Sequence, residues 1–198
     1  MSKTYACLFA ASLLLLTIQA SAQTATFFGP TPYLQQSDTP AGFSALPVVL
    51  ENFEDSVLDP DLSTVATIIG PGGLTDSVDI DDGVIDGSGT AGRSAFSGSP
   101  VRITFSSRPV SAGLVWTDGG SNASVTFQAF DGAGLSLGTH GPFVLGDNSN
   151  TGTTAEDRFF GVRYAQGISA ILITHTSGGY EIDHIQWTKD LLLRDGFE

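Results

Sequence analysis

The sequence predicts an all-β protein, a single antiparallel β-sandwich. Between residues 112 and 187, short apolar stretches alternate with glycine-containing turns. Several of these stretches place apolar and polar residues at alternate positions, which is typical of a half-buried strand. No stretch longer than about two turns shows the 3.6-residue period of an amphipathic helix. The 24 glycines of the chain suit many short strands joined by tight turns.

The first 22 residues are predicted to be a secretory signal peptide. Lys3 supplies a basic start, an apolar stretch follows from Leu8 to Ile18, and Ala20-Ser21-Ala22 matches the pattern that precedes a cleavage site. The apolar stretch is shorter than the roughly 20 residues that span a bilayer. We therefore expect a secreted, extracellular protein without membrane insertion, and leave its association with the cell surface open.

Composition narrows the partners of the mature chain. The one cysteine, Cys7, lies in the signal peptide, so disulfides, thiol nucleophiles and thiolate metal sites are excluded. Removal of Lys3 leaves 7 basic residues against 21 acidic ones, a formal net charge of −14. Nucleic acid is an unsuitable partner for such a chain, because phosphate contacts need clustered lysine and arginine. Neutral ligands and cations remain possible partners. The oligomeric state is not predicted.

The order of the elements follows from these patterns. Residues 23–47 are expected to form an extended lead-in rich in proline, threonine and serine, residues 48–188 the sandwich, and residues 189–198 a short tail. The Asp- and Gly-rich segment 76–92 and the polar segment 146–157 are expected to be loops, and residues 131–134 a hairpin turn. Strands are expected near 48–55, 65–69, 101–106, 112–120, 123–130, 135–138, 158–164, 168–175 and 180–187.

Calcium is the best supported chemistry. This ion prefers six to eight oxygen ligands from carboxylates, amides and backbone carbonyls. The candidate ligands lie at the first core strand and in the last strand: Glu51, Asn52, Glu54, Asp55 and Asp183. The alternative is that these groups are solvated strand ends or pair with arginine. Residues 79–83 are a weaker second candidate with a partial EF-hand pattern, and a solvated loop is favoured there.

Binding of a sugar is the second hypothesis from the residues. Flat aromatic side chains stack on sugar rings while a few polar groups bind the hydroxyls. The candidate ligand-binding residues are Trp116, Asp118, Asn122, Asp157, Arg158 and Tyr180. For Trp116, packing in the core is favoured over ligand contact, and for Arg158 a local salt bridge with Glu156 or Asp157 is favoured.

Catalysis is less expected than binding, and no catalytic residue is assigned. The sequence has no G-x-S-x-G nucleophile motif. The histidines, His140, His175 and His184, form no metal or catalytic pattern and are expected to pair locally within strands, although convergence in space stays open. No pair of carboxylates is singled out for glycoside hydrolysis.

Six motifs resemble a family of uncharacterised secreted bacterial domains, many of which carry a PEP-CTERM sorting signal. They are DDGVIDGSGTAG, AGLVWTDGG, FQAFDGAGLSLGT, AEDRFFGV, GISAI and GGYEIDHIQW, and they extend from about Phe53 to Trp187. The last four residues resemble the Asp-Gly-Phe-Glu tail of many secreted Gram-negative proteins.

The family resemblance implies a jelly-roll sandwich similar to carbohydrate-binding modules, in which a structural calcium often bridges the first and last strands. We therefore expect a secreted, non-catalytic module that binds extracellular glycan and holds a structural calcium. A structural or adhesive protein of the cell surface or matrix is the alternative. A glycan-active hydrolase is the third hypothesis.

Overall fold

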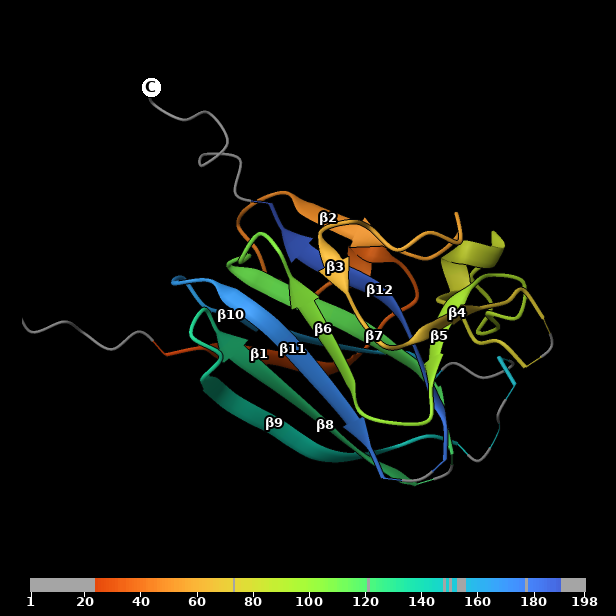
Figure 1. Cartoon of the computed structure of the whole chain (residues 1–198). Helices are drawn as coiled ribbons and strands as arrows, with labels where there is room; N and C mark the ends of the chain where they lie inside the picture. Colours follow the sequence, from red (N-terminus) through yellow and green to blue (C-terminus); the bar gives the residue numbers. More distant parts are fainter. Residues whose placement is uncertain are drawn as a thin grey trace, which may run out of the picture.

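Two antiparallel sheets pack against each other in the computed structural model, which confirms the predicted β-sandwich (Figure 1). The structure describes residues 24–189 except 73, 121, 148, 150, 153–155 and 177. The predicted signal peptide and residues 190–198 of the tail therefore lie outside the described residues. Within the described part, the helical elements are two short 3-10 helices, η1 (Gln36–Asp38) and η2 (Asp79–Asp82).

The first sheet has seven strands. Its order is β1 (Thr26–Pro32), β10 (Arg158–Arg163), β7 (Ser111–Gly119), β12 (Tyr180–Thr188), β5 (Ser94–Ser97) and β4 (Thr67–Ile69), while β2 (Val48–Glu51) pairs with β12 on the same side as β5. The central strand β12 therefore contacts β7 on one side and both β5 and β2 on the other.

The second sheet has five strands in the order β3 (Leu62–Ser63), β6 (Val101–Phe105), β11 (Ile168–His175), β8 (Ala123–Asp131) and β9 (Ser136–Leu145). From β5 to β8 the chain alternates between the two sheets, and it does so again from β10 to β12. The central orders β10-β7-β12-β5 and β6-β11-β8-β9 are the connectivity of an eight-stranded jelly roll.

The main core fills the space between the sheets. On β6 the predicted alternation is confirmed, because Val101, Ile103 and Phe105 are buried while Arg102 and Thr104 are exposed. The large aromatic side chains of this core include Trp116 and Trp187, both fully buried. Burial of such side chains contributes much of the driving force in a chain without disulfides.

The first sheet is also covered on its outer face. Strands β7 and β12 are buried at all nine of their residues, which requires cover on both faces. A smaller apolar cluster forms there from Tyr33, Phe43, Val78, Val115 and Phe159. Because its members come from both the lead-in and the Asp-rich segment, these two segments together form a cover over the sheet. We call residues 33–43 and 75–92 the covering segments.

The Asp-rich segment therefore differs from the solvated loop that its composition favoured. Asp76, Ser77, Val78 and Asp79 are all buried, although Asp86 is exposed. In Figure 1 this yellow-green segment gathers at the end of the sandwich where β4 and β5 lie. Buried polar groups need partners, and the contacts of these residues define the candidate site.

Candidate functional site

Five buried carboxylates meet where the covering segments contact β7 and β12. Strands β7 and β12 supply Asp118 and Glu181, which lie directly opposite each other in the strand pairing. Asp76 comes from a covering segment, and Glu156 and Asp157 precede β10. All five are between 2% and 7% exposed. We call them the buried carboxylate group.

Several of the oxygens in this group have hydrogen-bond donors. The backbone N–H of Asp76 donates to Glu181 Oε2 over 2.9 Å, and the Ser94 hydroxyl donates to the same oxygen. The neighbouring Asp118 and Glu156 carboxyls affect the pKa of each other, and the backbone of Asp79 lowers the pKa of Asp157. The bonds to Glu181 fix a covering segment to the sheet.

Other oxygens of the group are buried without a hydrogen-bond donor among the described residues. They are Asp76 Oδ2, Asp118 Oδ1, Glu156 Oε2 and Asp157 Oδ1. A buried polar atom that makes no hydrogen bond costs about 1–3 kcal/mol, and a charged one costs more. Each of these atoms is an exception, since native structures leave few buried polar atoms unsatisfied.

Burial raises the pKa of every member of the group. It raises the pKa of Asp76 to about 10, that of Glu156 to about 8 and that of Glu181 to about 7. Repulsion between carboxylates adds to the effect, and the largest charge effects on the pKa of Asp76 come from Asp157 and Asp118. The folded protein therefore opposes ionisation of these side chains.

Arg158 offsets part of this effect at one member of the group. Its positive charge lowers the pKa of Asp157, while burial keeps that pKa well above the ordinary value. The guanidinium Nη1 donates to the backbone carbonyl of Asp157 over 2.7 Å. Arg158 thus contacts the backbone of its neighbour, and the salt bridge with Glu156 or Asp157 stays a prediction.

A pocket of about 340 Å³ opens beside the buried carboxylate group. Asp118 and Glu181 line it together with Ile69, Leu74, Phe96 and Tyr180. The Phe96 side chain is 42% exposed, and its ring lies over Gly179, where an added Cβ would come within 2.3 Å of it. The pocket thus combines an accessible aromatic ring with two carboxylates.

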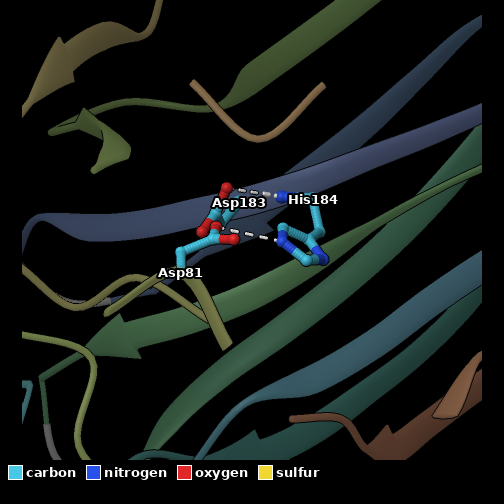
Figure 2. Close-up of side chains that lie close together, drawn as sticks. All are labelled: Asp81, Asp183 and His184. Carbon is cyan, nitrogen blue, oxygen red and sulfur yellow. Dashed lines mark hydrogen bonds and ion pairs between the residues drawn. The ribbon is translucent and has the colours of Figure 1, made fainter. Parts of the chain in front are cut away.

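A second group of side chains lies further along β12 (Figure 2). Asp81, Asp183 and His184 each offer a ligand atom within 4.8 Å of the others, so they could hold a metal ion. Asp183 is fully buried, and it accepts the backbone N–H of Val78 over 2.9 Å and that of His184 over 2.6 Å. Asn52 Nδ2 donates to Asp81 Oδ1 over 3.3 Å. Burial and repulsion from Asp81 raise the pKa of Asp183 well above its ordinary value.

The His184 ring is hydrogen-bonded at both nitrogens. Gln186 Nε2 donates to the Tyr33 hydroxyl over 2.8 Å, and that hydroxyl lies 2.9 Å from Nδ1. Nε2 lies 3.0 Å from Asp81 Oδ2. This chain of bonds is satisfied when Tyr33 donates to Nδ1 and Nε2–H donates to Asp81. A cation that used the imidazole would have to break one of these bonds, whereas the oxygens of Asp81 and Asp183 have further lone pairs.

The expectation that the histidines pair locally is wrong for His140 and His184. His184 bonds to Tyr33 and Asp81, which are 151 and 103 residues away in the sequence. His140 Nε2 lies 2.7 Å from the carbonyl oxygen of Gly29, 111 residues away. The reason is that neighbours in a jelly roll come from distant parts of the chain.

The residues predicted to bind calcium divide into two sets. Glu51, Glu54 and Asp55 accept backbone N–H groups outside β12: Glu51 those of Phe53 and Asp59, Glu54 that of Arg93, and Asp55 that of Val57. Asn52 and Asp183 instead both lie close to Asp81: Asn52 donates a hydrogen bond to it, and Asp183 has a ligand atom within 4.8 Å of one of its own. The sequence offered Asp81 only within the weaker candidate 79–83 and did not connect it with Asp183 or His184, because their proximity depends on how the Asp-rich segment folds over β12.

The residues predicted to bind a sugar are also dispersed. Trp116 is fully buried in the main core, as its sequence context favoured, and Tyr180 is 2% exposed. The Tyr180 hydroxyl accepts the N–H of Val101 and lies 3.0 Å from the carbonyl oxygen of Ile173. Asp118 and Tyr180 line the pocket, whereas Asp157 lies in the buried carboxylate group. Asn122 follows β7 in a left-handed conformation with φ of 53°.

Sequence reasoning missed Phe96, Asp76, Glu156 and Glu181. One signal could have found Glu181: in YEIDHIQW, polar residues occur within a strand that is otherwise strongly apolar. Polar residues in such a strand are expected to face solvent, unless another segment of the chain covers that face of the sheet. Phe96 lies in β5, a strand too short and too rich in serine to stand out.

No family model and no curated protein matches this chain. Among solved structures it is similar to the K2 cleaved adhesin domain of Lys-gingipain, with 10% identity and a TM-score of 0.46 over 72% of this chain and 99% of that one. It is also similar to the catalytic unit of a GH87 α-1,3-glucanase from Streptomyces thermodiastaticus, with 15% identity and a TM-score of 0.41 over 73% of this chain and 26% of that one. Similarities at this level carry no argument about function.

The described part of the chain contains no helix with the length and apolar character needed to cross a membrane.

Proposed function

We propose that this protein is a secreted, non-catalytic module that binds extracellular glycan at the pocket beside Phe96. The observation that carries the proposal is the composition of that pocket, an exposed aromatic ring next to the carboxylates of Asp118 and Glu181. A ring of this kind stacks on the face of a sugar, and carboxylates accept hydrogen bonds from its hydroxyls. The volume of about 340 Å³ is near the lower end for small-molecule sites.

The proposal includes a structural calcium between the end of β2, the η2 segment and the last strand, β12. What supports it is the approach of Asn52 to Asp81, and of Asp81 to Asp183 and His184. Asp81 and Asp183 offer the oxygen donors that calcium prefers. In a chain without cysteine in its mature part, such an ion would stabilise the sandwich outside the cell.

Phe96→Ala should weaken glycan binding at least about tenfold, which corresponds to about 1.4 kcal/mol of binding free energy. The reason is the loss of the stacking surface. Binding of the purified wild type to an array of bacterial and plant polysaccharides identifies a ligand, and titration calorimetry then compares the two proteins. The control is Val144→Ala, which removes an exposed apolar side chain from β9 on the opposite sheet and should leave binding unchanged.

Other outcomes decide between the hypotheses. Equal affinity of Phe96→Ala and wild type for the same sugar would show that the pocket is not the binding site. Absence of binding to any glycan, together with self-association or retention in the cell matrix, would favour the structural or adhesive alternative. Turnover of a polysaccharide that is abolished by Glu181→Gln would favour the hydrolase.

A further inference from the structure

We propose that the metal group formed by Asp81, Asp183 and His184 controls glycan binding at the pocket, because one stretch of the Asp-rich segment belongs to both places. This stretch is residues 74–81, which we call the shared stretch. Calcium at the metal group fixes the shared stretch, and with it a wall of the pocket, in the position that receives the glycan. The inference rests on the proposed function, since it concerns the regulation of the same pocket.

The shared stretch runs from the pocket to the metal group along strand β12. Leu74 lines the pocket. The backbone N–H of Asp76 donates to Glu181 Oε2 over 2.9 Å, and Glu181 lines the pocket as well. Two residues later, the backbone N–H of Val78 donates to Asp183 Oδ2 over 2.9 Å. The shared stretch is thus bonded to β12 both at the pocket and at the metal group.

Strand β12 also belongs to both places. Tyr180 and Glu181 line the pocket, whereas Asp183 and His184 are members of the metal group. Ile182 between them is fully buried in the main core. Glu181 and Asp183 both accept N–H groups from the shared stretch, so both face the cover. The two places are therefore one residue apart on a strand that is buried along its whole length.

Asp81 is the member of the metal group that the shared stretch supplies. Figure 2 shows it beside Asp183 and His184, which come from β12. The two carboxylates repel each other, since the charge of Asp81 raises the pKa of Asp183. A cation between the two carboxylates replaces this repulsion by attraction. Calcium therefore draws the end of the shared stretch onto β12.

The other end of the shared stretch shapes the pocket. Leu74 lines the pocket together with Phe96, whose ring is the proposed stacking surface. The Leu74 side chain is 67% exposed, whereas residues 75–79 that follow it are buried. An exposed wall residue next to a buried anchor keeps its position only while the anchor is ordered. Order at the metal group is thus passed to the pocket over a few residues of chain.

Coupling between two binding sites is reciprocal and typically changes affinity about 5–150-fold. We therefore expect calcium to raise the affinity for glycan at least about fivefold. The glycan should raise the affinity for calcium by the same factor, because both ligands favour the same position of the shared stretch.

Hydrogen exchange at neutral pH, without glycan, tests the coupling on the protein alone. Relative to chelator, calcium should slow exchange of the Val78 N–H at the metal group and of the Asp76 N–H at the pocket, each at least about fivefold. The internal control is the Leu135 N–H, which donates to Asp131 Oδ1 in a hairpin turn of the second sheet and should exchange at an unchanged rate.

Asp81→Asn keeps the shape of the side chain and removes its charge, so it should abolish the effect of calcium on both N–H groups. Asp86→Asn, an exposed residue of the same segment, is the matched control and should retain both effects. Near-ultraviolet circular dichroism checks that each variant is folded, and Asp183→Asn replaces Asp81→Asn if the latter is not.

Three results of the exchange experiment would overturn the inference. They are slower exchange of Val78 without a change at Asp76, no effect of calcium on either N–H group, and slowing of Leu135 as large as that of Asp76. The last result would mean that calcium acts on the whole domain and not on the pocket wall.

Titration calorimetry with a polysaccharide that the array identifies measures the effect on binding. The affinity of the wild type should fall at least about fivefold in chelator, and that of Asp81→Asn should be equally low in calcium. Equal affinity of the wild type in calcium and in chelator would refute the regulation and leave the glycan site in place. Absence of binding to any glycan would instead contradict the proposed function, while hydrogen exchange still decides whether calcium orders the pocket wall.

Discussion

In chelator, the protein is expected to lose stability as the pH rises from about 5 to about 8. Burial raises the pKa of Glu181 to about 7 and that of Glu156 to about 8, both above the ordinary glutamate value. The folded state then binds more protons than the unfolded state across this range. The stability from these groups is complete below the unfolded pKa, near 4, and is lost as the pH rises through the folded values.

Each such group lowers the free energy of unfolding by at most about 1.4 kcal/mol per pH unit. Denaturant unfolding at pH 5, 6, 7 and 8 measures the slope. Glu181→Gln should reduce the loss, whereas Asp86→Asn should not. With calcium present the loss should shrink or reverse, because the ion binds ionised carboxylates and stabilises the native state. A chelator-treated protein whose stability is constant or rises with pH would contradict the expectation.

Phe43→Ala is expected to lower the free energy of unfolding by about 3–5 kcal/mol. The side chain is 1% exposed, and its ring packs edge-on against Phe159 with 5.1 Å between ring centroids. It also contacts Phe28 at 5.9 Å, and an added Cβ on Gly161 would come within 2.8 Å of it. The substitution leaves a cavity between the lead-in and the outer face of the first sheet.

Denaturant unfolding at constant pH, in calcium, measures this loss. Leu46→Ala is the matched control, since Leu46 lies in the same lead-in, is 45% exposed and should change stability by well under 1 kcal/mol. Hydrogen exchange should show faster exchange in the covering segments of Phe43→Ala than in those of the wild type. Equal stability of Phe43→Ala and wild type would mean that the lead-in does not contribute to the folded domain.

The period-two pattern was sufficient to predict the main strands. In β6 and β8 every second residue faces the main core, and the sequence alternates accordingly, as in Val125, Phe127 and Ala129. Three strands were not predicted: β1, β5 and β3, which has only two residues. β5 has only four residues with serine at both ends, and β1 lies in a proline-containing stretch that pairs with β10 as an added strand.

The cover could not be predicted in the same way. Asp and Gly residues usually indicate a solvated loop, yet Asp76 and Asp79 are buried because the outer face of β7 and β12 provides a surface for them. The partners of Asp183 and His184 come from β12 itself and from residues more than 100 positions away. The spacing of residues along the chain does not show which distant residues come close in space. For the same reason, only Asp118 and Tyr180 of the predicted sugar-binding residues line the pocket.

Native mass spectrometry of the purified protein, prepared at neutral pH without chelator, tests most directly whether a calcium ion binds between Asp81 and Asp183. The expected spectrum contains the mass of the chain plus bound calcium, and Asp183→Asn carries one ion fewer than the wild type while Asp86→Asn carries the same number. Brief treatment with chelator should remove the added mass. A folded wild-type chain that carries no metal under these conditions, even after incubation with calcium, would contradict the cation site.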